Sequence, residues 1–364
     1  MNFIPWANPN YWGGEKEYVN DALDSLWISG GSYLEKLEKS FSELLNKKYV
    51  LTTSNGTTSI HLIYLGLDLQ RGDEIIVPGF AFLAASNIAL QMGLTPVFVE
   101  VDPETWCVTA GDIEKKITKK TKAIVPVHTY GNVCEMKSIN QLAADNNISV
   151  VEDCAESLFS KIDGQYSGTY GHVNSFSFQA TKTITTGEGG LVVTDNEALY
   201  RKMSLYRSHG LTQRGRYWHE LPGHNFRLTN LQAALGVAQF EKKAVIIEER
   251  KRVFDLYKKY LAKTDGILLQ RYNDNVDPVV WAIALMLDDE AFPQGRDTVL
   301  KQLREKNIET RPGFVSSSLL NIYSPHALPI CEELSRKVIS LPSFPLLTEE
   351  QIKYICDSLN LLRR

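Results

Sequence analysis

The sequence has no apolar stretch long enough to span a bilayer and no block of charge of a single sign. Its first residues, Met1-Asn-Phe-Ile-Pro-Trp-Ala7, lack the charged and apolar parts of a secretory signal. The net charge is −4 at pH 7, from 39 basic and 43 acidic residues, and no basic stripe is present that could bind nucleic acid. We therefore expect a cytoplasmic protein that binds neither membrane nor nucleic acid.

Cysteine is scarce, and its spacing fits neither a zinc site nor a disulfide framework. None of the five cysteines forms a C-x-x-C pair, so we expect all of them to be buried and reduced. The seven histidines show no spacing that groups them as ligands, and we predict that there is no metal site. Internal repeats and low-complexity linkers are absent as well.

Short apolar runs alternate with helical patterns over the first half of the chain. This alternation predicts a mostly parallel sheet that is covered by helices on both faces. With 43% hydrophobic and 23% charged residues, the composition is that of an ordinary globular protein, and 364 residues suffice for two domains. The predicted strands are Glu74–Val77, Pro96–Val101, Lys122–Val127, Ile148–Asp153, Val173–Phe178 and Leu191–Thr194.

A helical pattern begins near Thr229 and continues through Tyr257, where the charge density rises. We interpret it as the passage into a smaller domain, which places a large domain with the N-terminal segment at 1–240 and a small C-terminal domain at 241–364. The smaller domain ends in Leu347-Thr-Glu-Glu-Gln351, which has the pattern of a capping box before an amphipathic helix.

Lys182 follows a strand-like segment and precedes a glycine-rich turn, in Ser177-Phe-Gln-Ala-Thr-Lys-Thr-Ile-Thr-Thr-Gly-Glu-Gly-Gly190. A free lysine has a pKa of about 10.4 and becomes a nucleophile only when burial or nearby cations lower that value. Apolar walls and close backbone would have this effect. Taken alone, Lys182 would be interpreted as a surface lysine in a loop.

Asp153 ends the apolar run Ile148-Ser-Val-Val-Glu-Asp153. A carboxylate at the carboxyl end of a buried strand lies where open α/β sheets bind their ligands. It could hold the proton on the ring nitrogen of a pyridine cofactor. From Asp153 alone, a cap of the following helix is the favoured interpretation.

Small hydroxyl residues in Ser54-Asn-Gly-Thr-Thr-Ser59 come directly before a buried helix face. The start of a helix exposes unpaired N–H groups and the positive end of the dipole, so it can bind phosphate without lysines. Gly56 would allow close approach of the backbone, and Thr57 would add a hydroxyl. Taken alone, ordinary N-capping is the favoured interpretation of this segment.

These motifs occur in a fixed order with a fourth, Gly223-His-Asn-Phe-Arg-Leu-Thr-Asn-Leu-Gln-Ala-Ala234. Together they resemble the DegT/DnrJ/StrS family of pyridoxal-phosphate sugar aminotransferases, nearly from end to end. The stretch from Tyr206-Arg-Ser-His-Gly210 to Asn225 is most similar to the branch that makes GDP-perosamine. The resemblance implies an α/β protein of aminotransferase fold type I, with a large, mostly parallel-sheet domain and a smaller C-terminal α+β domain.

The resemblance also implies the role of each matching residue. Lys182 would bond covalently to pyridoxal 5'-phosphate, and Asp153 would pair with the ring nitrogen. Asn225 would reach the cofactor phosphate of the neighbouring subunit, which implies a homodimer with shared active sites. The other implied cofactor contacts are Gly56, Thr57 and Ser177 at the phosphate, Phe82 stacked on the ring, and Glu156 beside it.

The implied substrates are small molecules: an amino donor, L-glutamate by family analogy, and a nucleotide-linked 4-keto-6-deoxy sugar. A sister branch of the family carries histidine in place of the lysine and removes a sugar hydroxyl, so Lys182 favours amino transfer. His209, Arg227 and Arg311 are the candidate substrate contacts. A surface ion pair is an equally good interpretation of either arginine.

The segment after Arg311-Pro312 departs from the family. It reads Gly313-Phe-Val-Ser-Ser-Ser-Leu-Leu320, without the usual aromatic-Tyr-Pro run and histidine. This departure leaves a smaller acceptor, such as dihydroxyacetone phosphate, as an alternative. A third hypothesis, a non-catalytic regulator that binds the cofactor, is disfavoured by the complete set of Lys182, Asp153, Ser177 and Asn225.

Overall fold

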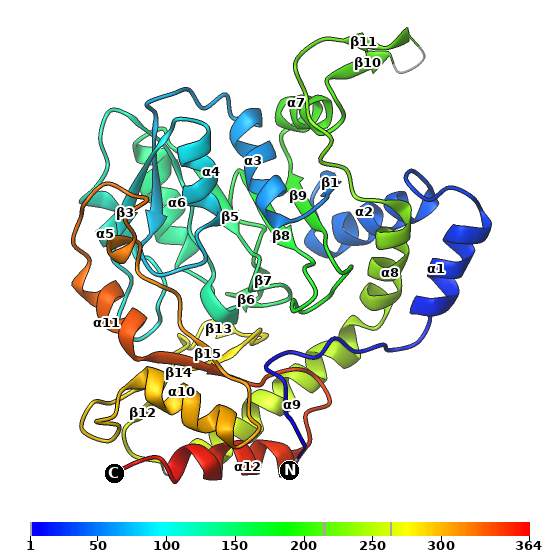
Figure 1. The fold of residues 1–364 in the computed structure, drawn as a ribbon. Helices are drawn as coiled ribbons and strands as arrows, with labels where there is room; N and C mark the ends of the chain where they lie inside the picture. The colour runs from blue at the N-terminus through cyan, green and yellow to red at the C-terminus, as the bar shows by residue number, and fades with distance from the viewer. Residues whose placement is uncertain (1, 214–215, 263) are drawn as a thin grey trace.

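A seven-stranded sheet forms the centre of the larger part of the molecule (Figure 1). The computed structural model describes residues 2–213, 216–262 and 264–364. The strand order is β1-β9-β8-β5-β4-β2-β3, with all pairs from β8 to β3 parallel and β9 antiparallel to both of its neighbours. The strands are β1 (Tyr49–Thr53), β2 (Glu74–Pro78), β3 (Thr95–Val99), β4 (Thr121–Ile124), β5 (Ser149–Asp153), β8 (Val173–Ser177) and β9 (Gly190–Thr194).

All six strands that the sequence predicts in this region are present, and the mostly parallel sheet is confirmed. The sequence patterns missed β1, which lies at the edge of the sheet and pairs with β9. Tyr49 faces Thr194 across this pair, about as far apart in the chain as any two strands of the sheet. The residues of β1, Tyr49-Val-Leu-Thr-Thr53, are mostly β-branched or aromatic, so the strand does carry a local signal, which the prediction missed.

Helices cover both faces of the sheet. Since successive side chains of a strand point to opposite faces, neighbouring residues of the buried strands pack in different cores. Val50 and Val193 pack in the core formed with α2 and α8, whereas Leu51 and Val192 belong to the core formed with α3 and α7. The helices of this region are α1 (Glu15–Asp24), α2 (Ser32–Leu45), α3 (Gly56–Gly66), α4 (Ala84–Gln91), α5 (Ala110–Glu114), α6 (Met136–Asp145), α7 (Glu197–Arg207) and α8 (Asn230–Glu241).

The single long helix predicted from Thr229 to Tyr257 is wrong in one respect. It is two helices, α8 and α9 (Lys243–Leu261), because Lys242 leaves helical geometry at φ −97° and ψ 11°. Apolar spacing continues across this break, so the periodicity alone did not reveal it. α9 then carries the chain towards the second sheet (Figure 1). A domain boundary near residue 240 remains a prediction.

The second sheet is antiparallel, in the order β12-β14-β16-β15. It packs with α9, α10 and α12 around a third core, which also includes Ile4 from the N-terminal segment. Figure 1 shows the beginning of the chain beside α12. The elements are β12 (Ile267–Leu269), β14 (Ile283–Leu287), β15 (Arg311–Pro312), β16 (Val338–Leu341), α10 (Arg296–Glu305), α11 (Pro329–Lys337) and α12 (Glu349–Asn360).

The capping box predicted before the last helix is confirmed. The Thr348 side chain accepts from the Gln351 amide, and the Gln351 side chain accepts from the Thr348 amide. Smaller elements complete the description: β6 (Lys161–Ile162), β7 (Gln165–Tyr166), β13 (Val276–Asp277), the hairpin of β10 (Leu211–Gln213) and β11 (Trp218–His219), and the 3-10 turns η1 (Thr129–Gly131) and η3 (Ser317–Leu319).

The five cysteines are free and buried, as the sequence predicts. Within the described ranges, no helix combines the length and the apolar character needed to cross a membrane.

Candidate active site

A cavity of about 540 Å³ lies at the carboxyl end of the parallel strands, where open α/β sheets bind ligands. The structure brings together there seven of the residues selected from the sequence: Gly56, Thr57, Phe82, Asp153, Glu156, Ser177 and Lys182. Five of them lie at the ends of β2, β5 and β8 or in the segments that follow these strands: Phe82, Asp153, Glu156, Ser177 and Lys182. The cavity is therefore a consequence of the sheet topology.

Lys182 lies in the loop that connects β8 to β9. Paired backbone bonds close the base of this loop, since the Phe178 amide donates to Gly189 and the Thr186 amide donates to Phe178. The Lys182 amide donates to Gln179 in the tight turn that presents the side chain. Because these bonds fix the loop between two buried strands, the lysine points into the cavity and its side chain is only 12% exposed.

The Lys182 ammonium lies over the ring of Trp281, with Nζ 3.7 Å from the ring centroid, and 3.9 Å from Glu156 Oε1. Burial lowers the pKa of Lys182, the carboxylates of Glu156 and Asp153 raise it, and Arg250 lowers it further. The net direction is downward. A lysine whose pKa is lowered gives up its proton more readily, which is what nucleophilic or general-base chemistry requires.

Asp153 is buried at the end of β5, and the backbone holds it on both sides. Its amide donates to Pro126, its carbonyl accepts from the His128 amide, and its Oδ1 accepts from the Ala155 amide. Burial raises the pKa of Asp153, while the Ala155 amide and Lys182 oppose that shift. The carboxylate caps a turn, and the chain continues through described residues from β5 to β6 without a helix, so the interpretation of Asp153 as the cap of a following helix is wrong. Asp153 lies on the cavity wall instead.

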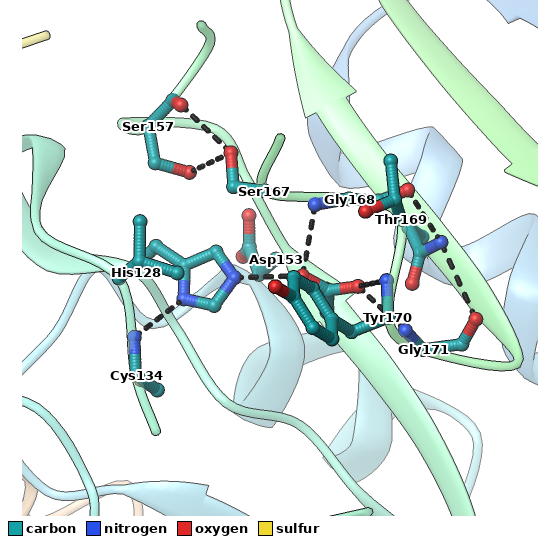
Figure 2. A network of polar contacts seen from close by, with 12 residues as sticks. His128, Cys134, Asp153, Ser157, Ser167, Gly168, Thr169, Tyr170 and Gly171 are labelled. Carbon is teal, nitrogen blue, oxygen red and sulfur yellow. Dashed lines mark hydrogen bonds and ion pairs between the residues drawn. The ribbon is translucent and has the colours of Figure 1, made fainter. Parts of the chain in front are cut away.

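A buried network beside Asp153 fixes the end of β5 (Figure 2). Glu152 accepts hydrogen bonds from the amides of Gly168, Tyr170 and Gly171, and its Oε2 lies 3.0 Å from His128 Nε2. The Cys134 amide donates to His128 Nδ1, so the ring proton is assigned to Nε2, which donates to Glu152. Burial would raise the pKa of Glu152, but His128 and the glycine amides hold it below its usual value.

His128, Glu152 and Cys154 bring possible metal-ligand atoms within 4.8 Å of one another. Hydrogen bonds already engage both ring nitrogens of His128 and both carboxylate oxygens of Glu152. We interpret the group as part of the network that positions the neighbouring Asp153. The absence of a metal site stays a prediction.

Glu156 is also buried, and the amide of Tyr130 fixes its orientation by donating to Oε2 over 2.8 Å. Tyr130 adopts a left-handed conformation, with φ 56°, that turns this amide towards the carboxylate. Burial raises the pKa of Glu156 to about 7, against the opposing effects of Lys182 and the Tyr130 amide. The side chain can therefore be neutral or ionised near neutral pH.

The N-terminus of α3 forms another part of the cavity wall. Asn55 caps the amide of Thr58, and Gly56 and Thr57 begin the helix at the cavity. A Cβ atom on Gly56 would lie 2.9 Å from Cβ of Ser177. Glycine is therefore required where the helix passes the end of β8. The first amides of the helix and the Ser177 hydroxyl together form a cradle for an anionic group.

Three aromatic side chains that were not selected from the sequence, Trp6, Trp281 and Phe314, also line the cavity. Phe314 stacks on Tyr130 with 5.0 Å between ring centroids, and Phe82, which is 63% exposed, meets Phe314 edge-on at 6.4 Å. Trp6 and Trp281 also pack edge-on, at 5.6 Å. Phe314 belongs to the segment that departs from the family, so that segment supplies part of the wall.

Four of the residues selected from the sequence lie outside the cavity lining within one chain. Asn225 is exposed and bridges to Ser208 beyond the end of α7, and His209 lies at the base of the β10–β11 hairpin. Arg227 follows Phe226, whose carbonyl accepts from the Ser54 amide. Arg311 is exposed and pairs with Glu309 over 2.8 Å. Roles for these four residues stay predictions.

Comparison with known proteins agrees with the motifs. The model of the DegT/DnrJ/EryC1/StrS aminotransferase family matches residues 13–360. GDP-perosamine synthase from Escherichia coli O157:H7 is 42% identical over 99% of this chain and 98% of its own length, and that from Vibrio cholerae is 38% identical, with 97% of each chain covered. The resemblance stated from the sequence is confirmed.

Solved structures agree with the fold. PseC of Helicobacter pylori, an aminotransferase involved in the biosynthesis of pseudoaminic acid, has a TM-score of 0.95 at 26% identity, with 99% of each chain covered. The PLP form of the sugar aminotransferase Spr1654 from Streptococcus pneumoniae has a TM-score of 0.94 at 25% identity, with 99% of this chain and 98% of that one covered. The predicted aminotransferase fold is confirmed.

The raised pKa of Glu156 gives a prediction for the cofactor-free protein. Infrared spectra should contain a band from a buried protonated carboxyl that fades as the pH rises through about 7, because the neutral acid ionises there. Glu156→Gln should remove this band. Glu188→Gln, at an exposed position of the same cavity, is the control and should leave it unchanged. If the spectra of the wild type and of Glu156→Gln are the same at every pH, the assignment of this band to Glu156 is wrong.

Proposed function

We propose, because this chain belongs to the DegT/DnrJ/EryC1/StrS aminotransferase family, that it transfers an amino group from an amino acid to the keto group of a nucleotide-linked 4-keto-6-deoxy sugar. Family membership makes it a pyridoxal-phosphate-dependent aminotransferase. The single observation that carries the proposal is the buried amine of Lys182 in one cavity with Asp153 and the α3 N-terminus. L-Glutamate is the proposed donor.

The cavity fits pyridoxal phosphate in size and in chemistry. Its volume of about 540 Å³ is that of a small-molecule site, and a glycine at its wall keeps the helix amides open to a phosphate. Gly56, Thr57 and Ser177 would hold the phosphate, Phe82 would cover the ring, and Asp153 would hold the ring nitrogen. When bound, the cofactor supplies an electron sink through which the amino group passes from donor to acceptor.

The chain's own residues supply the proton transfers. Lys182 would take a proton from the donor's α-carbon and return one, since burial lowers its pKa and the Trp281 face and Glu156 hold its position. The buried Asp153 carboxylate would keep the ring nitrogen protonated. Glu156, with its pKa near 7, can accept or donate a proton beside the amine. The aromatic side chains of the wall would limit the access of water to these groups.

The proposed acceptor rests on relatives named GDP-perosamine synthase, which are 36% to 42% identical to this chain over nearly their whole length. Phe314 and Phe82, whose rings meet edge-on in the cavity lining, offer apolar ring faces on which a sugar ring or a base can pack. The Gly313–Leu320 segment therefore adds an aromatic contact where it departs from the family pattern.

We also propose a homodimer in which Asn225 completes the partner's site. Asn225 is exposed and lies outside the cavity of its own chain. It precedes Phe226, whose carbonyl binds the Ser54 amide at the start of the phosphate-cradle segment. Large apolar side chains that suit an interface are exposed at Leu26, Trp27, Ile28, Tyr217 and Trp218.

The acceptor is tested with enzyme carrying the amino form of the cofactor, which regains its original absorbance only when a ketone is aminated. GDP- or dTDP-linked 4-keto-6-deoxy sugars should react at least about a hundredfold faster than dihydroxyacetone phosphate, because the nucleotide provides binding energy remote from the reacting carbon. Rapid reaction of the small ketone and none of any nucleotide sugar would replace our proposal with the smaller acceptor.

The shared site is tested by mixing a Lys182→Ala chain with an Asn225→Ala chain. Each variant alone should have little activity, while each heterodimer should contain one intact site. Random reassociation makes half of the dimers heterodimers, so activity should recover to about a quarter of the wild-type value. Failure to recover, or an isolated monomer with full activity, would rule out the shared site.

A further inference from the structure

A second, smaller cavity lies on the other side of Lys182, and it contains a buried cation without a carboxylate. Its volume is about 30 Å³, enough for a carboxylate group or a halide. Lys182, Thr181, Trp281 and Trp6 line both cavities. The smaller one is completed by α9, by the C-terminal end of α8 and by the N-terminal segment, which contribute Arg250, Gln239 and Asn10 among others.

Arg250 is the unusual member of this lining. It is 4% exposed, and its Nη1 donates to three backbone carbonyls, with the best bond, 2.9 Å, to Trp281. Its buried Nε has no hydrogen-bond partner among the described residues. Burial lowers the pKa of the guanidinium to about 10, so it is still charged at neutral pH. No acidic residue is among the described residues that line this cavity.

A buried charge is costly unless it is paired, and a buried N–H without an acceptor adds to the cost. Here Arg250 and Lys182 both line one small polar cavity, and Lys182 already has the carboxylate of Glu156 nearby. Glu15, a buried carboxylate that bonds the cavity residue Gln239, is already engaged by the amides of Trp12 and Gly13 and by the Gln239 side chain. A small anion in the cavity would balance the charge of Arg250.

We propose that this cavity is a binding site for a small monovalent anion of the carboxylate class, held by Arg250 behind Lys182. Its neighbours in the cavity lining, Asn8, Asn10 and Ser343, offer further donors. The anion could be free in solution or could be a carboxylate group of the amino donor. The inference goes beyond the proposed function, because its first test requires no acceptor.

The first experiment uses the holoenzyme at fixed pH. Formate is titrated at constant ionic strength, which is maintained with the anion of MES buffer, a sulfonate too large for the cavity. The visible absorbance of the cofactor should change with saturation, since a charge placed beside Lys182 perturbs it. Crystals soaked in bromide should show an anomalous peak within hydrogen-bond distance of Arg250. The proposal would be overturned if the wild type shows neither the absorbance change with formate nor the bromide peak near Arg250. A bromide peak found only elsewhere on the surface, as an adventitious ion, would also overturn it.

Variants then test the residue itself. Arg250→Gln should weaken formate binding by at least about tenfold, the value expected for losing a hydrogen bond to a charged group, and Arg250→Lys should restore part of it. Arg252→Gln is the matched control on the same helix, because Arg252 already pairs with Glu249 over 2.8 Å, and it should bind formate normally. Equal formate binding in Arg250→Gln and the wild type would overturn the proposal.

Donor kinetics distinguish the two sources of the anion. If the site holds the donor, formate competes with L-glutamate, and Arg250→Gln raises the KM for L-glutamate with an unchanged KM for the acceptor. If the site holds a free anion, formate binds in the presence of saturating donor. Either result supports an anion site. Failure of every nucleotide sugar to react would refute only the proposed acceptor.

Discussion

The amine of Lys182 is held in a largely buried position, where it contacts an aromatic ring and lies beside two carboxylates. Burial opposes charge on the lysine, on Asp153 and on Glu156 alike, so each group depends on the others and on nearby amides to carry charge. Small displacements would therefore change their protonation. Hydrogen bonds in the segments around these three groups hold them in place.

Those bonds come from separate segments. The paired backbone bonds at Phe178 fix the lysine loop, and the Glu152 network fixes the end of β5 just before Asp153. The left-handed turn at Tyr130 orients Glu156, and Gly56 allows α3 to approach Ser177. Each device is local, but all of them converge at the carboxyl edge of one sheet. The topology of the sheet thus determines where the chemistry can occur.

The sequence predicted those features whose signal is local. Lys182, Asp153 and Gly56 each stand at a junction between an apolar strand or helix and a polar turn, which residue patterns can locate. Their roles were implied only by the order of the motifs and the resemblance to a family. Residue patterns do not locate Trp281 and Arg250, because Trp281 lies in an apolar run that looks like ordinary core and Arg250 in a charged helix that looks solvated. Only the packing of the C-terminal part against the lysine loop brings them to the site. The break at Lys242 was missed for a similar reason, since apolar spacing continues across it.

The central claim is that Lys182, and no other lysine, bonds covalently to pyridoxal phosphate. Treating the holoenzyme with borohydride fixes that bond, and mass spectrometry of the digested protein locates it. The account predicts the cofactor mass on the peptide that contains Lys182, with Lys161 and Lys202 unmodified and no label in Lys182→Ala. Label on another lysine, or full retention of label in Lys182→Ala, would contradict it.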